Sequence, residues 1–179
     1  MIIKVRENLE LRTLVPGNAD EVFEVIDKNR EHIRQWLPWV DGYTLHNAKE
    51  SIARWKKSRE EKSDFTVGIF LGGNYIGNMG LHDINSHTNS AGIGYWLSPE
   101  WQGNGIMTDC VRALTNFGFD ELDLNRIYIA AAFGNAKSRA VPERLGFVQE
   151  GILQDCLKYH GVYHDKVIYG VVKRNWRAR

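Results

Sequence analysis

Cysteine and net charge are both scarce in this chain of 179 residues, and their scarcity excludes several classes of protein. Cys110 and Cys156 are the only cysteines, too few for a disulfide framework and without the Cys-x-x-Cys spacing of many metal sites. The formal charge of +1 lacks the basic excess of most proteins that bind nucleic-acid backbones. We therefore expect no metal site and no direct binding of nucleic acid.

Long apolar runs are missing as well. No stretch approaches the roughly 20 apolar residues that a helix needs to cross a bilayer. The opening residues, MIIKVRENLELRTL, have neither the apolar core nor the cleavage site of a signal peptide. With so few cysteines, this favours the reducing cytoplasm and no membrane association. No repeat or Pro/Gly/Ser linker interrupts the chain, so we expect residues 1–179 to form a single domain.

Hydrophobic periodicity predicts an α+β fold. Alternation predicts strands over 9–15, 65–71, 75–84 and 91–97, with the turn signal Gly72-Gly73-Asn74 between the second and the third. The apolar run 127–133 predicts a buried strand, and 147–159 with 162–172 a closing antiparallel pair. Helices are expected after the cap Asn18, around 33–37, and over about 47–60, 105–122 and 136–145. The result is a mixed, mostly antiparallel sheet with helices on both faces.

The segment from Ser98 to Thr108, SPEWQGNGIMT, lies between a predicted strand and a long predicted helix. Gly103 and Gly105 allow a tight turn, and the first amides of the helix, with its dipole, form a site for a phosphate or diphosphate. Such a glycine pair can equally be only a tight turn. A Walker loop is excluded because no Gly-Lys-Ser/Thr follows, and the dinucleotide fingerprint fails because Thr108 stands at its third glycine.

Several motifs together resemble the GNAT acetyltransferases. The run from Gln102 to Met107 is similar to their coenzyme A loop, Gln/Arg-x-x-Gly-x-Gly/Ala. Met107 departs from the small final residue, as in the Rim-type branch that acetylates the N-termini of ribosomal proteins. The resemblance covers nearly the whole chain and extends to Asn135-Ala136-Lys137-Ser138, Leu145-Gly146-Phe147, Glu150-Gly151, Trp36-Leu37-Pro38-Trp39 and the pattern from Gly161 to Tyr169.

The resemblance implies the GNAT acyl-CoA N-acyltransferase fold and transfer of acetyl from acetyl-CoA to a primary amine by direct attack. In this family the strands corresponding to 91–97 and 127–133 splay apart, and the gap admits the pantetheine arm. A backbone amide near Leu97 would polarise the thioester carbonyl. The implied cofactor-binding residues are Trp96, Leu97, Gln102, Gly103, Asn104, Gly105, Ile106, Met107, Thr108, Asn135 and Ser138.

The implied catalytic residues are Ser138 and Glu150. Ser138 would donate to the departing sulfur and Asn135 would hold the cofactor arm, although both could instead cap the following helix. Glu150 matches a family position for a base, but it could instead anchor a strand pair. Other candidate bases are His82, Asp83, Asp155, His160, His164 and Asp165, and the sequence does not choose among them.

The acceptor amine is left open among three hypotheses. The resemblance favours a protein N-terminus, possibly of a ribosomal protein, with Trp36, Trp39, His82 and Tyr163 binding it; the tryptophans could equally be core. A small-molecule acceptor such as a polyamine, amino sugar or amino acid is the second, and a non-catalytic acyl-CoA-binding module is the third. An open groove favours a peptide, and a closed acidic pocket a polyamine. Exposed tryptophans, for which Trp101 and Trp176 are candidates, would indicate a homodimer or larger homo-oligomer.

Overall fold

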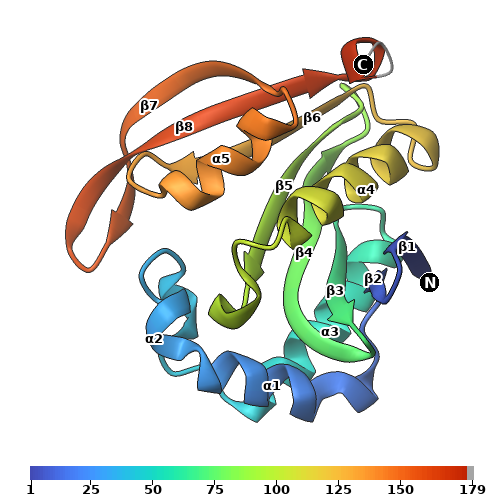
Figure 1. The fold of residues 1–179 in the computed structure, drawn as a ribbon, viewed down its shortest axis with the longest axis vertical. Coiled ribbons are helices and arrows are strands. Elements are labelled where there is room, and N and C mark those ends of the chain that lie inside the picture. Colours follow the sequence, from blue (N-terminus) through green and yellow to red (C-terminus); the bar gives the residue numbers. More distant parts are fainter. Residues whose placement is uncertain (177–179) are drawn as a thin grey trace.

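The computed structural model describes residues 1–176 of the chain, which contain one continuous eight-stranded sheet (Figure 1). The strands lie in the order β1-β2-β3-β4-β5-β6-β8-β7. Their bounds are β1 Ile2–Arg6, β2 Leu9–Arg12, β3 Phe65–Leu71, β4 Asn74–Asn85, β5 Ser90–Leu97, β6 Arg126–Ala132, β7 Val148–Tyr159 and β8 Val162–Val172. Neighbours are antiparallel except β5 and β6, which are parallel. The mixed, mostly antiparallel α+β fold expected from the sequence is therefore confirmed.

Helices cover both faces of the sheet. They are α1 Ala19–Lys28, α2 Arg30–Ile33, α3 Leu45–Glu60, α4 Ile106–Asp120, α5 Ala136–Arg144 and α6 Lys173–Trp176, with short 3-10 turns η1 Pro16–Asn18, η2 Pro38–Val40 and η3 Pro99–Trp101. The central strands β3, β4 and β5 contribute side chains to two separate cores. Val67, Leu81 and Ile127 pack beneath α4 and α5, whereas Phe70 and Tyr75 pack beneath α1 and α3. None of the helices in residues 1–176 is long and apolar enough to cross a membrane.

Several local details differ from the expectations, among them the helix expected around 33–37, which is instead the short α2 that ends at Ile33. The expected first strand over 9–15 is shorter, and a further strand, β1, precedes it across a turn in which Asn8 takes φ 58°. Helix α3 begins before Asn47, because Thr44 is its cap and exchanges hydrogen bonds with Asn47 in a capping box. Asn18 does precede α1, but its side chain accepts from the amide of Val15 rather than from the helix.

Candidate active site

The candidate site opens where β5 and β6 separate. The parallel register runs from Ser90 opposite Arg126 to Ile93 opposite Ile129 and stops there. Beyond it, Gly94–Leu97 on one side and 130–132 on the other line a cleft of about 1050 Å³. Helix α5 and the start of α4 complete its walls on one face of the sheet, and α2 contributes on the other. The cleft therefore passes between two strands of one sheet.

The glycine loop lies at one end of this cleft. Gly103 and Gly105 have φ 81° and 74°, and a Cβ at either position would have no atom within 4 Å. Conformation rather than crowding thus requires glycine there. The first intrahelical bond of this turn runs from the amide of Asp109 to the carbonyl of Gly105, so the preceding amides of α4 are free of helical partners. Ile106, Met107 and Thr108 line the cleft at this helix end, which is suited to an anionic ligand.

Cationic side chains from α5 face the same loop. Arg144 donates to Thr108 Oγ1 at 3.3 and 3.4 Å, which leaves the threonine hydroxyl hydrogen for a ligand. Lys137 Nζ lies 3.3 Å from Gln102 Oε1, and both cations line the cleft. Asn104, by contrast, does not line the cleft: its side chain donates to the carbonyls of Trp101 and Gln102 and holds the loop in shape. The loop and these two cations fit a diphosphate.

Gln102 links three parts of the cleft. Its amide nitrogen donates to the carbonyl of Leu97 at 3.1 Å and lies 2.8 Å from His32 Nε2, which therefore accepts. Burial, and next the charge of Lys137, lower the pKa of His32 and favour the neutral ring that this contact requires. His32 was missed from the sequence because a lone histidine on a short helix has no distinguishing pattern.

A pair of hydroxyl groups lies on the wall formed by β5 and α5. Tyr95 Oη donates to the carbonyl of Ser138 at 2.9 Å, and Ser138 Oγ donates to Tyr95 Oη at 3.3 Å. Burial raises the pKa of Tyr95 to about 12, so its hydroxyl remains a donor at neutral pH. Asn135 caps α5 by accepting from the amide of Ser138 at 3.2 Å, and both residues also line the cleft. Capping and a place in the cleft are thus compatible.

Comparison with known proteins gives this arrangement a family. Residues 8–148 match the description "Acetyltransferase (GNAT) domain". The chain belongs to the GNAT acetyltransferases.

Relatives match this GNAT acetyltransferase along almost its whole length. The "Putative ribosomal N-acetyltransferase YdaF" of Bacillus subtilis is 37% identical over 177 residues, 98% of this chain and 97% of the relative. The ribosomal-protein-serine acetyltransferase of Escherichia coli is 27% identical over 168 residues, 93% of this chain and 94% of the relative. RimL, the ribosomal L7/L12 alpha-N-protein acetyltransferase, in complex with coenzyme A, superposes with a TM-score of 0.93 at 26% identity, over 96% of this chain and 98% of that structure. The chain is therefore an acetyl-CoA-dependent N-acetyltransferase.

Glu150 lies outside the cleft of the acetyltransferase. Its carboxylate accepts from both terminal nitrogens of Arg126, at 2.6 Å for the Nη1–Oε1 pair, where β6 begins beside β8 and β7. The hydrogen bond from Arg126 lowers the pKa of Glu150 below its usual value. A carboxylate occupied in this way is a poor base, so the structure speaks against the catalytic role expected for Glu150. The strand-anchoring alternative describes what it does.

The residues expected to bind the acceptor are only partly brought together. Trp36 lines the cleft and reaches toward Gly134, so that a Cβ there would lie 3.5 Å from its ring. Trp39 does not line the cleft; it packs edge-on against Tyr43 with ring centroids 5.4 Å apart. Tyr163 is 58% exposed beneath Lys158 on the β7–β8 hairpin. His82 on β4 also lies outside the lining, and its side chain is on the opposite face of the sheet from that of Tyr95 on β5.

The β7–β8 hairpin closes one side of the site. It extends past the rest of the sheet, and its tip comes to α2 (Figure 1). There His160 Nε2 lies 3.1 Å from the carbonyl of Arg34, and the neighbouring Tyr159 lines the cleft. Arg30 holds the facing segment in place, since it donates to the carbonyls of Val40 and Tyr43. This side of the cleft is therefore bounded by α2, by Trp36 and Leu37 after it, and by the hairpin tip.

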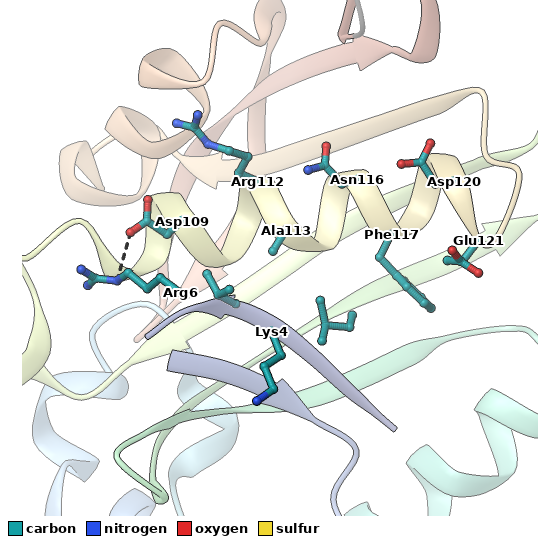
Figure 2. Close-up of a pocket in the computed structure, with 11 residues that line it drawn as sticks. Lys4, Arg6, Asp109, Arg112, Ala113, Asn116, Phe117, Asp120 and Glu121 are labelled. Atoms are coloured by element: carbon teal, nitrogen blue, oxygen red, sulfur yellow. Dashed lines mark ion pairs between the residues drawn. The ribbon is translucent and has the colours of Figure 1, made fainter. Parts of the chain in front are cut away.

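A second hollow, between β1 and α4, is a weaker candidate (Figure 2). Its volume is about 480 Å³, and an ion pair of 3.3 Å joins Arg6 and Asp109 at its edge. Its lining carries charges of both signs but no serine, cysteine, histidine or tyrosine among the described residues.

The tryptophans expected to be exposed are half-buried. Trp101 and Trp176 both pack against the core beneath α4, and Trp176 Nε1 donates to Asn116 at 2.6 Å. They therefore give no support to the expected homo-oligomer.

Proposed function

We propose that this acetyltransferase acetylates the α-amino group of a protein N-terminus. The observation that supports this acceptor most is the charge of the cleft: within residues 1–176, its lining contains no aspartate and no glutamate. A polyamine carries several positive charges and calls for carboxylates, whereas a peptide N-terminus brings only one charge, which must be lost before attack. A ribosomal protein as the acceptor is supported by the names of YdaF, RimL and the Escherichia coli relative.

The residues of the cleft suit acetyl-CoA as co-substrate. The amides from Gln102 to Thr108 would hold the diphosphate, with Lys137 and Arg144 adding positive charge. The edges of β5 and β6 beyond Ile93 and Ile129 have no strand partner in the gap, so they are available to the amides of the pantetheine arm. Trp96 and Leu97 would contact this arm, and Gln102 would give up the Leu97 carbonyl that it now occupies.

The hydroxyl pair is placed to assist the chemistry. As the amine nitrogen bonds to the thioester carbonyl carbon, the carbonyl oxygen becomes an oxyanion, which the amide near Leu97 would stabilise. When the carbon–sulfur bond breaks, Ser138 Oγ would turn from Tyr95 Oη and donate a hydrogen bond to the departing thiolate, which takes its proton from solvent. Tyr95 supports this role because its own hydrogen is committed to the Ser138 carbonyl, which fixes the serine backbone. The amine must arrive as the neutral base, since only then does it have a lone pair for attack.

Thiol release from acetyl-CoA tests this proposal directly. The wild-type protein is assayed with peptides whose N-termini are free, the same peptides with blocked N-termini, and spermidine. We expect turnover only with the free peptides, and in Ser138→Ala a fall in kcat of about 100-fold with little change in the acetyl-CoA KM. Turnover with spermidine but not with peptides would overturn the proposed acceptor. Acetyl-CoA binding without turnover of either the peptides or spermidine would likewise overturn the proposed acceptor.

A further inference from the structure

The ring of His82 packs over two glycines, Gly80 and Gly94, which we call the glycine floor. Gly80 on β4 and Gly94 on β5 are cross-strand partners on the sheet face that carries α1 and α3. A Cβ at Gly80 would lie 3.1 Å from His82 Cε1, and a Cβ at Gly94 would lie 3.2 Å from Cδ2 and 3.4 Å from Nε2. A side chain at Gly94 would push the ring away, whereas one at Gly80 would first meet the carbonyl of Phe65 and the Cα of Thr66, at 2.9 and 3.0 Å. Both glycines leave room for the ring.

Asp64 orients this ring. His82 Nδ1 lies 3.5 Å from Asp64 Oδ1, and the same oxygen accepts from the backbone amide of Asp83 at 3.1 Å. A carboxylate at Nδ1 favours the tautomer with hydrogen on Nδ1 and leaves the lone pair on Nε2. The carboxylate also stabilises the imidazolium that forms when Nε2 takes a proton. Asp64 and His82 thus form a pair whose free nitrogen faces β5.

The free nitrogen lies beside the start of the cleft. Gly94 is the first residue of β5 beyond the last pair with β6, and it lines the cleft. Tyr95 and Ser138 lie on the opposite face of the sheet, beneath α5. Sulfur chemistry at Ser138 on one face would therefore meet, in the gap, an amine that enters from the other face, and His82 lies on that other face.

We propose that His82 accepts the proton of the attacking amine and that Asp64 is its positioning residue. This inference rests on the proposed amine acetylation. The amine nitrogen forms its bond to the carbonyl carbon, the carbon–sulfur electron pair leaves with sulfur, and one N–H proton passes to His82 Nε2, directly or through one water. Three of the six other candidate bases are engaged elsewhere: Glu150 pairs with Arg126, Asp165 accepts from the amide of Asp155, and His160 contacts the carbonyl of Arg34 after α2.

The pH dependence of the reaction reports on this pair. The titratable groups facing His82 are Asp64 before β3, Asp83 on its own strand, and Tyr128 on β6, whose ring packs over Gly92, the cross-strand partner of His82. Strand β5 contributes only glycines to this contact. A rate that rises as His82 loses its proton gives an acid limb in kcat/KM, which a variant without the ring lacks.

The experiment compares His82→Ala, Asp64→Asn and the matched control His46→Ala, whose imidazole lies on the surface of α3 beside Glu50. The substrate is the best amine acceptor of the wild-type protein, whether a peptide or a small amine. We expect His82→Ala to lose about 100-fold in kcat without a change in acetyl-CoA binding, to lose the acid limb, and to regain activity with added imidazole. Asp64→Asn should lose about tenfold and shift the acid limb, and His46→Ala should match the wild type.

The possible failures are separable. If only small amines are substrates, the proposed peptide acceptor is overturned while the test of His82 proceeds on that amine. If His82→Ala keeps the acid limb, or if its loss is not relieved by imidazole, the proton-acceptor role is overturned whatever the acceptor. A His82→Gln variant with a wild-type melting temperature distinguishes lost chemistry from lost folding, because it keeps a polar side chain of similar size over the glycine floor.

Discussion

Strands β5 and β6 behave differently along their length. Through Ile93 and Ile129 they are hydrogen-bonded neighbours, with Ala91 and Ile127 fully buried. Beyond these residues they part and line the cleft, yet each remains bound to its other neighbour. Leu97 still pairs with Gly77 on β4, and Ala132 still pairs with Lys166 on β8. A sheet can therefore open in its middle when each separated strand keeps one partner, and the edges exposed in this way become the binding surface.

The largest expected effect is a loss of stability in the part of the sheet where β5 and β6 are hydrogen-bonded to each other. Ile127→Ala removes a fully buried side chain beneath α4 and should destabilise the protein by about 2–4 kcal/mol. Met107→Ala, at the half-buried cleft end, should cost about 1 kcal/mol, because that site is already open on one side. Urea unfolding of both variants measures the difference. Equal losses would mean that the two halves are packed alike.

In the part where β5 and β6 separate, we expect acetyl-CoA binding to be most sensitive to substitutions in the glycine loop. Gly105→Glu places a carboxylate where a diphosphate is expected and should weaken acetyl-CoA binding by about 100-fold, as measured by calorimetry. Gly105→Asn is the control, since asparagine tolerates the positive φ of this residue without adding charge. Binding lost equally in both variants would point to backbone strain instead of charge.

A smaller effect is expected from Tyr95→Phe, which removes the hydroxyl between β5 and α5. The Ser138 carbonyl loses a donor, so we expect a loss of about 1 kcal/mol in stability and of a few-fold in kcat. The pKa of Tyr95 is raised from 10.0 to about 12, so this contribution is full below pH 10 and is lost as pH rises through about 12. Melting curves at pH 8 and pH 11 should therefore show a smaller difference between variant and wild type at the higher pH.

The smallest effect is expected at Glu150, which lies outside the cleft. Glu150→Gln breaks a partly exposed ion pair with Arg126 and should cost less than about 1 kcal/mol, with kcat within about threefold of the wild type. Steady-state kinetics with the best acceptor provide the measurement. A fall in kcat as large as that of Ser138→Ala would restore Glu150 as a catalytic residue.

The sequence predicted much of the fold because its strands are strongly patterned. Strand β3 was placed at 65–71 as observed, and the hairpin at Gly72 and Gly73 follows it. Strand β1 was missed because it has only five residues, so the alternation of Ile3 and Val5 with the exposed Lys4 and Arg6 is too short a signal. It pairs with Leu9–Arg12 as a hairpin across the two residues Glu7 and Asn8.

The candidate site was predictable only where a local motif defines it. The loop from Gln102 to Thr108 is determined by neighbouring residues, because Gly103 and Gly105 allow the turn and α4 begins directly after them. The sequence alone therefore predicted it. Tyr95 and His32 were missed because their meaning depends on partners 43 and 70 residues away, Ser138 and Gln102. The partner of Glu150 was hidden from the sequence for the same reason, since Arg126 lies on another strand 24 residues away.

The position of β8 has a consequence for synthesis of the protein. It is the last strand in residues 1–176, yet it lies between β6 and β7 and pairs with both. A nascent chain that has reached only residue 160 already contains the glycine loop, Ser138 and His82. In such a chain β6 lacks β8, the neighbour with which it pairs from Arg126 to Ala132, so its open end loses its hydrogen-bonded support. Vectorial folding would thus leave the acetyltransferase without a working cleft until its closing strand has emerged.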